Sequence, residues 1–149
     1  MKAGLSERLK EVNEALSAFT DEMKARDVWD DVTTVVTSDF GRTLTANSGL
    51  GSDHGWGGHY FAMGGSVRGG QIHGDYPADM TESGPLNLGR GRMIPTMSWE
   101  SILNPIFTWM GVSSDEDLNY CLPNRLNTGA KLLPVEDVFL GDRDNVFAH

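Results

Sequence analysis

Apolar residues near the N-terminus recur every three or four positions, and this spacing predicts an amphipathic helix over residues 6–26. Charged residues fill the opposite face, and Ser6 is a candidate N-cap with Glu7 in the first turn. We expect this helix to pack its apolar stripe on a sheet. The stripe consists of Leu5, Leu9, Val12, Leu16, Phe19 and Met23.

The pattern changes to β-branched and aromatic runs after this helix. Residues 32–38 form a candidate strand without a strongly polar interior, which is typical of a strand covered on both faces. Residues 59–63 and 71–76 are two further candidate strands, separated by two Gly-Gly pairs. Segments 41–58 and 77–92 are rich in glycine and polar residues, so the middle of the chain should be loop-rich.

A second amphipathic helix is predicted over residues 98–110, with Ser98 as its N-cap and Gly111 as its stop. Pro105 lies off the apolar stripe, so a bend of the helix toward solvent is tolerable there. The stripe should be buried. It comprises Trp99, Ile102, Leu103, Ile106, Phe107 and Met110.

The predicted elements follow the order helix, strand, loop, two strands and two helices, of which the last begins near Asp115 and ends before Pro123. This order predicts an α/β protein, namely a partial α/β/α sandwich with a small, mostly parallel sheet and a loop-rich middle. We expect residues 1–149 to form a single domain and residues 139–149 to be a flexible tail.

The composition is that of an acidic globular protein, with 39% hydrophobic residues among 149. A net charge of −9 offers no basic surface for nucleic acid or an anionic membrane, and the apolar runs are too short for membrane insertion. The single cysteine, Cys121, excludes an internal disulfide. The N-terminal residues resemble the start of a helix more than a signal peptide, and the compartment stays open.

Acidic and imidazole side chains gather in segment 32–74, at the end of the first strand and in the glycine-rich loop behind it. Asp39 ends the strand, and Asp53, His54 and His59 lie in the loop. Carboxylate and imidazole groups bind Zn²⁺ and other divalent metals. We interpret Asp39 and His54 as candidate metal ligands, with Asp53 or His59 as a further ligand or an orienting group. The alternative is that Asp53 caps a turn and that the histidines are polar loop residues.

Two other motifs bear on chemistry. Arg42, in the sequence DFGRT, has the geometry either to bind an oxyanion or to pair with Asp39. The sequence CLPNR at 121–125 fits the Cys-x-Pro-x-Arg skeleton from which sulfatases make their formylglycine nucleophile. Here it lies close to the C-terminus, and a helix stop at Pro123 explains the same residues. The chain therefore offers no identified catalytic nucleophile.

These motifs together resemble an uncharacterised family, domain of unknown function 1501, which is similar to the alkaline phosphatase and sulfatase superfamily. The resemblance covers about residues 5–140. It implies the C-terminal part of an α/β/α sandwich, in which Asp39 and His54 match the strand-end acid and the loop histidine of a two-metal site. The matching sequences are WDDVTTVVTSDFGRT at 29–43, SDHGWGGHYFAMGGSVRGGQIHGDYP at 52–77, GRGRMIPTMSW at 89–99 and LPNR at 122–125.

Two departures from the superfamily pattern decide which function we expect. Phe40 stands where many members have a metal-binding histidine, and the superfamily's nucleophile comes from an N-terminal half that this chain lacks. The sequence therefore favours a non-catalytic structural or interaction protein, with or without a vestigial metal site. It would bind a protein partner or a second copy through an open sheet edge. Candidate anchors are Trp56, Tyr60, Trp99 and Trp109.

The alternative is a metal-dependent phosphate or sulfate ester hydrolase that needs the missing half. Zinc or another divalent metal would be its cofactor, and Arg42 its oxyanion contact.

Overall fold

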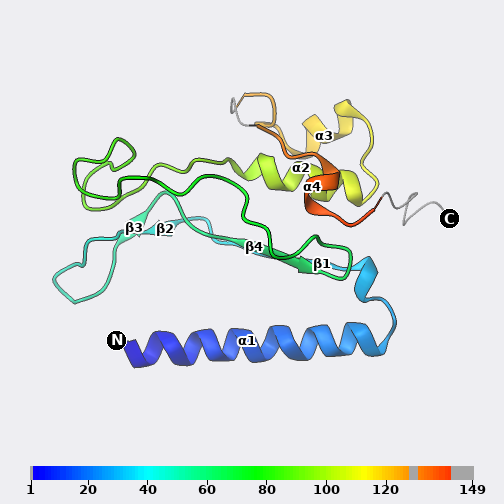
Figure 1. Ribbon diagram of the computed structural model, residues 1–149, viewed down its shortest axis with the longest axis horizontal. Coiled ribbons are helices and arrows are strands. Elements are labelled where there is room, and N and C mark those ends of the chain that lie inside the picture. Colours follow the sequence, from blue (N-terminus) through cyan, green and yellow to red (C-terminus); the bar gives the residue numbers. More distant parts are fainter. Residues whose placement is uncertain (1, 128–130, 142–149) are drawn as a thin grey trace. The chain divides into compact units, whose positions relative to one another are not determined.

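The computed structural model describes residues 2–127 and 131–141, and its backbone forms two compact units (Figure 1). Unit 1 comprises residues 1–65 and 80–94, and unit 2 comprises residues 66–79 and 95–149. The N-terminal helix and all four strands belong to unit 1, whereas the remaining α-helices belong to unit 2.

Helix α1 spans Lys2–Ala25, so the predicted helix is confirmed, but it begins before Ser6 and that residue is not its N-cap. Most of its apolar stripe is exposed, with Leu5 at 63% and Leu9 at 60%, whereas Leu16 and Met23 are half-buried. The prediction that the helix buries this stripe against a sheet is therefore wrong for most of its residues. Charged residues occur along the whole of α1, and none of the described helices is both long and apolar enough to cross a membrane.

The C-terminal end of α1 is held by the short helix η1, Trp29–Asp31. The backbone N–H of Val28 donates to the Met23 carbonyl oxygen over 3.1 Å, and the Lys24 Nζ lies 6.0 Å from the Trp29 ring centroid. These contacts hold the last turn of α1 to the rest of unit 1.

The strands of unit 1 form two antiparallel pairs. Strand β1 (Thr33–Val36) pairs with β4 (Phe61–Gly64), and β2 (Gly41–Arg42) pairs with β3 (His54–Gly55). The pairs follow one another as a long, interrupted ribbon whose tip is the loop of residues 43–53 (Figure 1).

This arrangement contradicts the predicted mostly parallel sheet and the partial α/β/α sandwich built on it. Parallel strands need a crossover connection, usually a helix, to carry the chain back to the same end. Residues 37–60 contain no helix and instead fold back as a hairpin, which delivers β4 antiparallel to β1. Helices and strands are both present, and the middle of the chain is loop-rich as expected.

The candidate strands agree with the structure in part. The strands predicted at 32–38 and 59–63 correspond to β1 and β4, with shifted ends. The strand predicted at 71–76 is wrong, because that segment has no ladder partner among the described residues. Segment 77–92 is irregular as predicted, apart from an isolated bridge between Asn87 and Met93.

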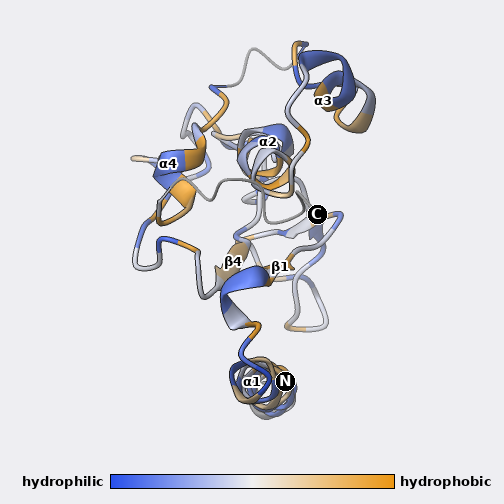
Figure 2. Cartoon of the chain, turned by 90° about the vertical axis from the view of Figure 1, so that its right-hand side faces the viewer, coloured by the Kyte–Doolittle hydropathy of each residue, from blue (hydrophilic) through white to orange (hydrophobic). Residues whose placement is uncertain are grey.

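Unit 2 is built from helices α2 (Trp99–Trp109), α3 (Asp115–Cys121) and α4 (Val135–Val138). Helix α2 contacts both α3 and α4, and Figure 2 shows that α3 is mostly hydrophilic whereas α2 and α4 carry residues of both kinds. The buried hydrophobic side chains of the described chain all belong to this unit. They are Ile106, Trp109, Leu118, Leu122, Leu133, Val138 and Phe139.

The predicted ends of α2 are confirmed, but its buried face is not the predicted one. Ser98 is the N-cap, and Gly111 follows the helix with φ +98°. Of the predicted stripe only Ile106 is buried, whereas Trp99 is 41% and Met110 47% exposed. The face that packs inward carries Ser101, Pro105, Ile106 and Trp109.

Pro105 lies on the buried face of α2, not on the solvent side as the sequence indicated, and its burial has a backbone reason. Proline has no N–H, so the carbonyl of Ser101, one turn earlier, receives no helical hydrogen bond from it. That carbonyl instead accepts the backbone N–H of Leu133 over 3.1 Å. A buried carbonyl needs a partner, and the 131–133 segment supplies one on this side of the helix.

The predicted tail begins inside the core of unit 2. Phe139 is completely buried, and its ring stacks on Trp109 with 4.8 Å between the ring centroids. Val67 and Phe139 form a backbone bridge, and α4 itself was not predicted. Residues 142–149 of the predicted tail lie outside the described residues.

Candidate functional site

The β2–β3 pair brings Arg42 and His54 together, because these two residues are direct cross-strand partners. The His54 ring stacks on Phe40 with 4.0 Å between centroids, and the Arg42 guanidinium carbon lies 5.0 Å from the Phe40 ring centroid. Arg42 also donates from Nη1 to the Ser52 carbonyl oxygen over 3.1 Å. Phe40 thus serves as an aromatic surface for its two neighbours.

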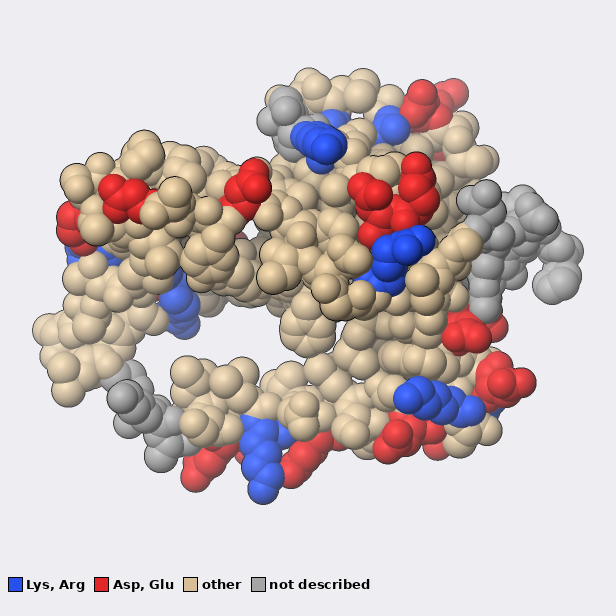
Figure 3. Space-filling view, in the orientation of Figure 1, with Lys and Arg blue, Asp and Glu red and all other residues tan. Residues whose placement is uncertain are grey.

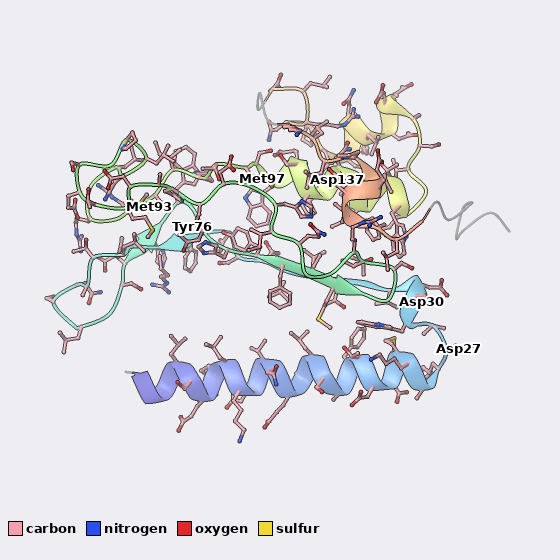
Figure 4. All side chains as sticks on the ribbon, viewed as in Figure 1. Asp27, Asp30, Tyr76, Met93, Met97 and Asp137 are labelled. Atoms are coloured by element: carbon pink, nitrogen blue, oxygen red, sulfur yellow. The ribbon has the colours of Figure 1, made fainter. Side chains whose placement is uncertain are left out.

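Gly41 is required by the close approach of two backbone segments. A methyl group on its Cα would lie 1.8 Å from the carbonyl oxygen of Gly57, which is far inside van der Waals contact. The N–H of Gly57 in turn donates to the Met93 carbonyl oxygen over 2.8 Å (Figure 4). The glycine of the DFGRT sequence therefore allows three segments of unit 1 to meet.

Asp53 is held on both sides of its carboxylate. Oδ1 accepts Nδ2 of Asn47 over 2.8 Å, and Oδ2 accepts Nη2 of Arg90 over 2.7 Å. The hydrogen bond from Asn47, followed by that from Arg90, holds the pKa of Asp53 below its ordinary value of 3.8. Both oxygens of this carboxylate are engaged in loop contacts, which matches the reading of Asp53 as a residue that fixes a turn.

The other predicted site residues are placed separately. Asp39 lies exposed between β1 and β2, and His54 and His59 are also exposed. Among the described residues no three His, Cys, Asp or Glu side chains are grouped so as to hold a metal ion. The donor set expected for zinc or another divalent metal, Asp39, Asp53, His54 and His59, therefore does not fit such an ion in this arrangement.

The residues that hold the hairpin tip could not be recognised from the sequence. Glu82 Oε2 accepts the backbone N–H of Arg90 over 2.9 Å, and its Oε1 accepts the Thr45 hydroxyl over 3.0 Å. The turn-forming sequence TANSG suggested a loop at Asn47, but no local pattern indicates that segment 80–94 returns to it. Arg90 has φ +59°, an uncommon backbone conformation that a pattern of apolar residues does not reveal.

The CLPNR sequence has a structural role in unit 2. Arg125 is 11% exposed and donates to three acceptors, namely Asn104 Oδ1 at 2.6 Å, Asn119 Oδ1 at 2.9 Å and Asp115 Oδ1 at 2.9 Å. It joins α2 to α3 through side chains alone. Cys121 is a free, exposed cysteine.

Each unit also has a surface hollow, and neither hollow is lined by a candidate site residue of the motifs described above. The hollow in unit 1 is lined by Lys24, Trp29 and the acidic residues Asp27 and Asp30 near the end of α1 (Figure 4). The hollow in unit 2 is lined by residues 74–75, 96–97, 131 and 133 and by Ser101. Neither coincides with the residues that the sequence singled out.

Comparison with protein families gives one match, to the family described as protein of unknown function (DUF1501), over residues 1–86. The match covers more than half of the chain and includes the β2–β3 hairpin, so the protein belongs to this family. It ends before segments 89–99 and 122–125, to which the sequence resemblance had been extended. Neither the curated proteins nor the solved structures contain a match to this chain.

Proposed function

We propose that the protein is a non-catalytic interaction protein that binds a protein partner through unit 1. The observation that carries this proposal is the division of apolar burial between the two units. All buried hydrophobic side chains of the described chain lie in unit 2. Unit 1 instead exposes large apolar side chains, namely Leu5, Leu9, Val12, Phe19, Leu44, Leu50, Trp56, Tyr60, Phe61, Met80 and Leu88. Exposed apolar surface on this scale marks an association site.

The β1 strand offers a second feature for association. Its one edge pairs with β4, and no strand covers the other edge in the described part of the chain. The strand sequence TTVV has neither lysine nor proline to block the addition of another strand. Of the predicted anchors, Trp56 is 61% and Tyr60 38% exposed in the same unit. Backbone pairing at this edge and apolar contacts at these aromatic residues would reinforce one another.

Light scattering at micromolar protein, combined with an environment-sensitive apolar dye, tests this proposal. We expect the protein to associate or, where it stays monomeric, to bind the dye. Replacing Phe61→Ser should weaken the observed signal, because this 48% exposed side chain belongs to unit 1. Ile72→Ser is the matched control, since Ile72 is 91% exposed in unit 2 and should not matter. A monomer that binds no dye would contradict the proposal.

The alternative function is a metal-dependent phosphate or sulfate ester hydrolase. The observation in its favour is the pairing of Arg42 with His54 on the hairpin that follows Asp39. Zinc titration with calorimetric detection tests it directly. Stoichiometric zinc binding that is lost in both Asp39→Asn and His54→Ala, together with turnover of an aryl phosphate or sulfate, would favour this alternative. We expect no turnover with Zn²⁺, Mg²⁺ or Mn²⁺.

A further inference from the structure

We infer that the partner of α1 is α1 of a second copy of this chain, and that the two helices pair in antiparallel orientation. This inference rests on the proposed function, because it names the occupant of one apolar surface of unit 1. It is carried by the spacing of the exposed residues, by the length of the stripe and by the charges beside it.

The spacing of the stripe is that of a helix–helix seam. Its six members, Leu5 to Met23, are separated by four, three, four, three and four residues, which is the a/d pattern of a coiled coil. Val12 and Phe19 are 47% and 40% exposed, like Leu5 and Leu9 before them, whereas Leu16 and Met23 are half-buried. The charged side chains of α1 gather on the lower side of this helix in Figure 3. A helix with such a face derives most of its stability from whatever covers that face.

The length of the stripe favours a second helix over the protein's own strands. From Leu5 to Met23 the stripe rises about 27 Å at ~1.5 Å per residue. Strand β1, with four residues, extends only about 13 Å at ~3.3 Å per residue. The β1–β4 pair is therefore too short to cover the stripe, whereas another α1 has the same length and the same spacing.

The charges beside the stripe select the antiparallel orientation. With the two-fold axis level with residue 14, Leu9 packs beside Phe19 of the second copy, and Val12 beside Leu16. On the flank of the seam, Arg8 then faces Glu22 of the second copy, and this pair of opposite charges occurs twice. A parallel pair in register would instead place Arg8 opposite Asn13 and Glu22 opposite Asp27, so no opposite charges would meet.

Both flanking residues are available for such contacts. Arg8 binds Glu11 within its own helix with side-chain exposures of 73% and 59%, and Glu22 binds Arg26 with 55% and 67%. Exposed pairs of this kind are weak, so they can be shared with a facing helix at little cost.

Analytical ultracentrifugation of the full chain tests the inference. The protein concentration is varied from about 1 to about 100 µM in tenfold steps. We expect a monomer–dimer equilibrium that Leu9→Glu abolishes. Ser17→Glu is the matched control, because it adds the same charge to the same helix at an exposed position off the stripe. Circular dichroism of each variant shows whether α1 still forms.

Charge exchange tests the orientation independently of apolar packing. Arg8→Glu and Glu22→Arg should each weaken the dimer about tenfold, because each variant turns two attractive pairs into two repulsive ones. The double variant Arg8→Glu, Glu22→Arg should restore the original dissociation constant. Restoration also shows that the single variants do not act by unfolding the helix.

A dimer that survives Leu9→Glu, or that the double variant does not restore, would overturn the antiparallel α1 pair. A protein that is monomeric throughout would overturn it as well. If that monomer still binds apolar dye in a manner sensitive to Phe61→Ser, the proposed interaction function stands and only its self-pairing form fails.

Discussion

Arg90 donates from Nη2 to Oδ2 of Asp53 over 2.7 Å, and this ion pair joins segment 80–94 to the tip of the β2–β3 hairpin. The two side chains are 53% and 43% exposed, so water screens their attraction. The pair is nonetheless specific, because Asn47 holds the second oxygen of the same carboxylate. The hairpin tip and segment 80–94 thereby meet at one acidic side chain.

The carboxyl of Asp53 should titrate below its ordinary pKa of 3.8 in the folded protein, as a side-chain NMR titration can show. A pKa that is lower in the folded state stabilises the fold above pH 3.8, and this contribution is lost as the pH falls through the folded pKa. Asn47→Ala and Arg90→Gln should each raise the pKa of Asp53, since both side chains hold it low. An Asp53 pKa that is unchanged in Asn47→Ala would contradict the role of this hydrogen bond.

Gly41→Ala should destabilise unit 1 by about 1–3 kcal/mol, which is the usual cost of forcing extra volume into a packed site. The added methyl group would meet the carbonyl oxygen of Gly57 on the facing backbone, and backbone cannot rotate away. Gly69→Ala is the control, because nothing lies within 4 Å of its Cβ position. Urea unfolding of both variants measures the difference in their free energies of unfolding. Hydrogen exchange at the Thr43 amide reports on the hairpin itself. Equal stability of the two would mean that the hairpin is looser than described.

Arg125→Lys should destabilise unit 2 by about 1–3 kcal/mol, because a single ammonium group cannot reach three separated acceptors in the geometry of a guanidinium. Asp115→Asn is a suitable control. It keeps an acceptor oxygen at an 84% exposed position and should cost less than about 1 kcal/mol. Chemical denaturation of the two variants against the parent protein provides the comparison. Loss of a hydrolytic activity with unchanged stability in Arg125→Lys would instead indicate a catalytic role for CLPNR.

Phe139→Ala should cost about 3–5 kcal/mol, because it leaves a cavity against Trp109 in a small core. Phe107→Ala should cost clearly less, since Phe107 is only half-buried although it belongs to the stripe predicted from the sequence. Calorimetry of the unit 2 transition measures both. A smaller loss for Phe139→Ala than for Phe107→Ala would restore the predicted stripe as the buried face.

The sequence predicted the features that are determined by residues close to one another in the chain, such as the ends of helices. The ends of α2 at Ser98 and at the left-handed Gly111 follow from a residue type favoured before a helix and from a missing Cβ, and the structure has them there, although the Ser98 side chain makes no capping hydrogen bond. The direction of the strands could not be predicted in this way. It depends on whether the chain after β1 crosses over or turns back, and apolar periodicity is the same in both cases.

The buried face of α2 and the contacts of Asp53 were missed for a related reason. The sequence pattern ranks positions by hydrophobicity, whereas Pro105 is buried because a carbonyl freed by the proline meets the Leu133 N–H. Asp53 was read as a metal ligand from its neighbour His54, but its partners Asn47 and Arg90 are specified by loop folding. The metal and hydrolase interpretations stay predictions, although no three His, Cys, Asp or Glu side chains of the described residues are grouped so as to hold a metal ion.

The interrupted ribbon of unit 1 implies an order in which its two strand pairs form during folding. Joining β1 to β4 directly requires the chain to close over residues 37–60, and the entropic cost of closure grows with the length closed. Pairing Arg42 with His54 closes a shorter loop and leaves only brief segments on either side. Folding of this unit therefore has the lowest entropic cost when it starts at the β2–β3 hairpin. Strands β1 and β4 then pair last.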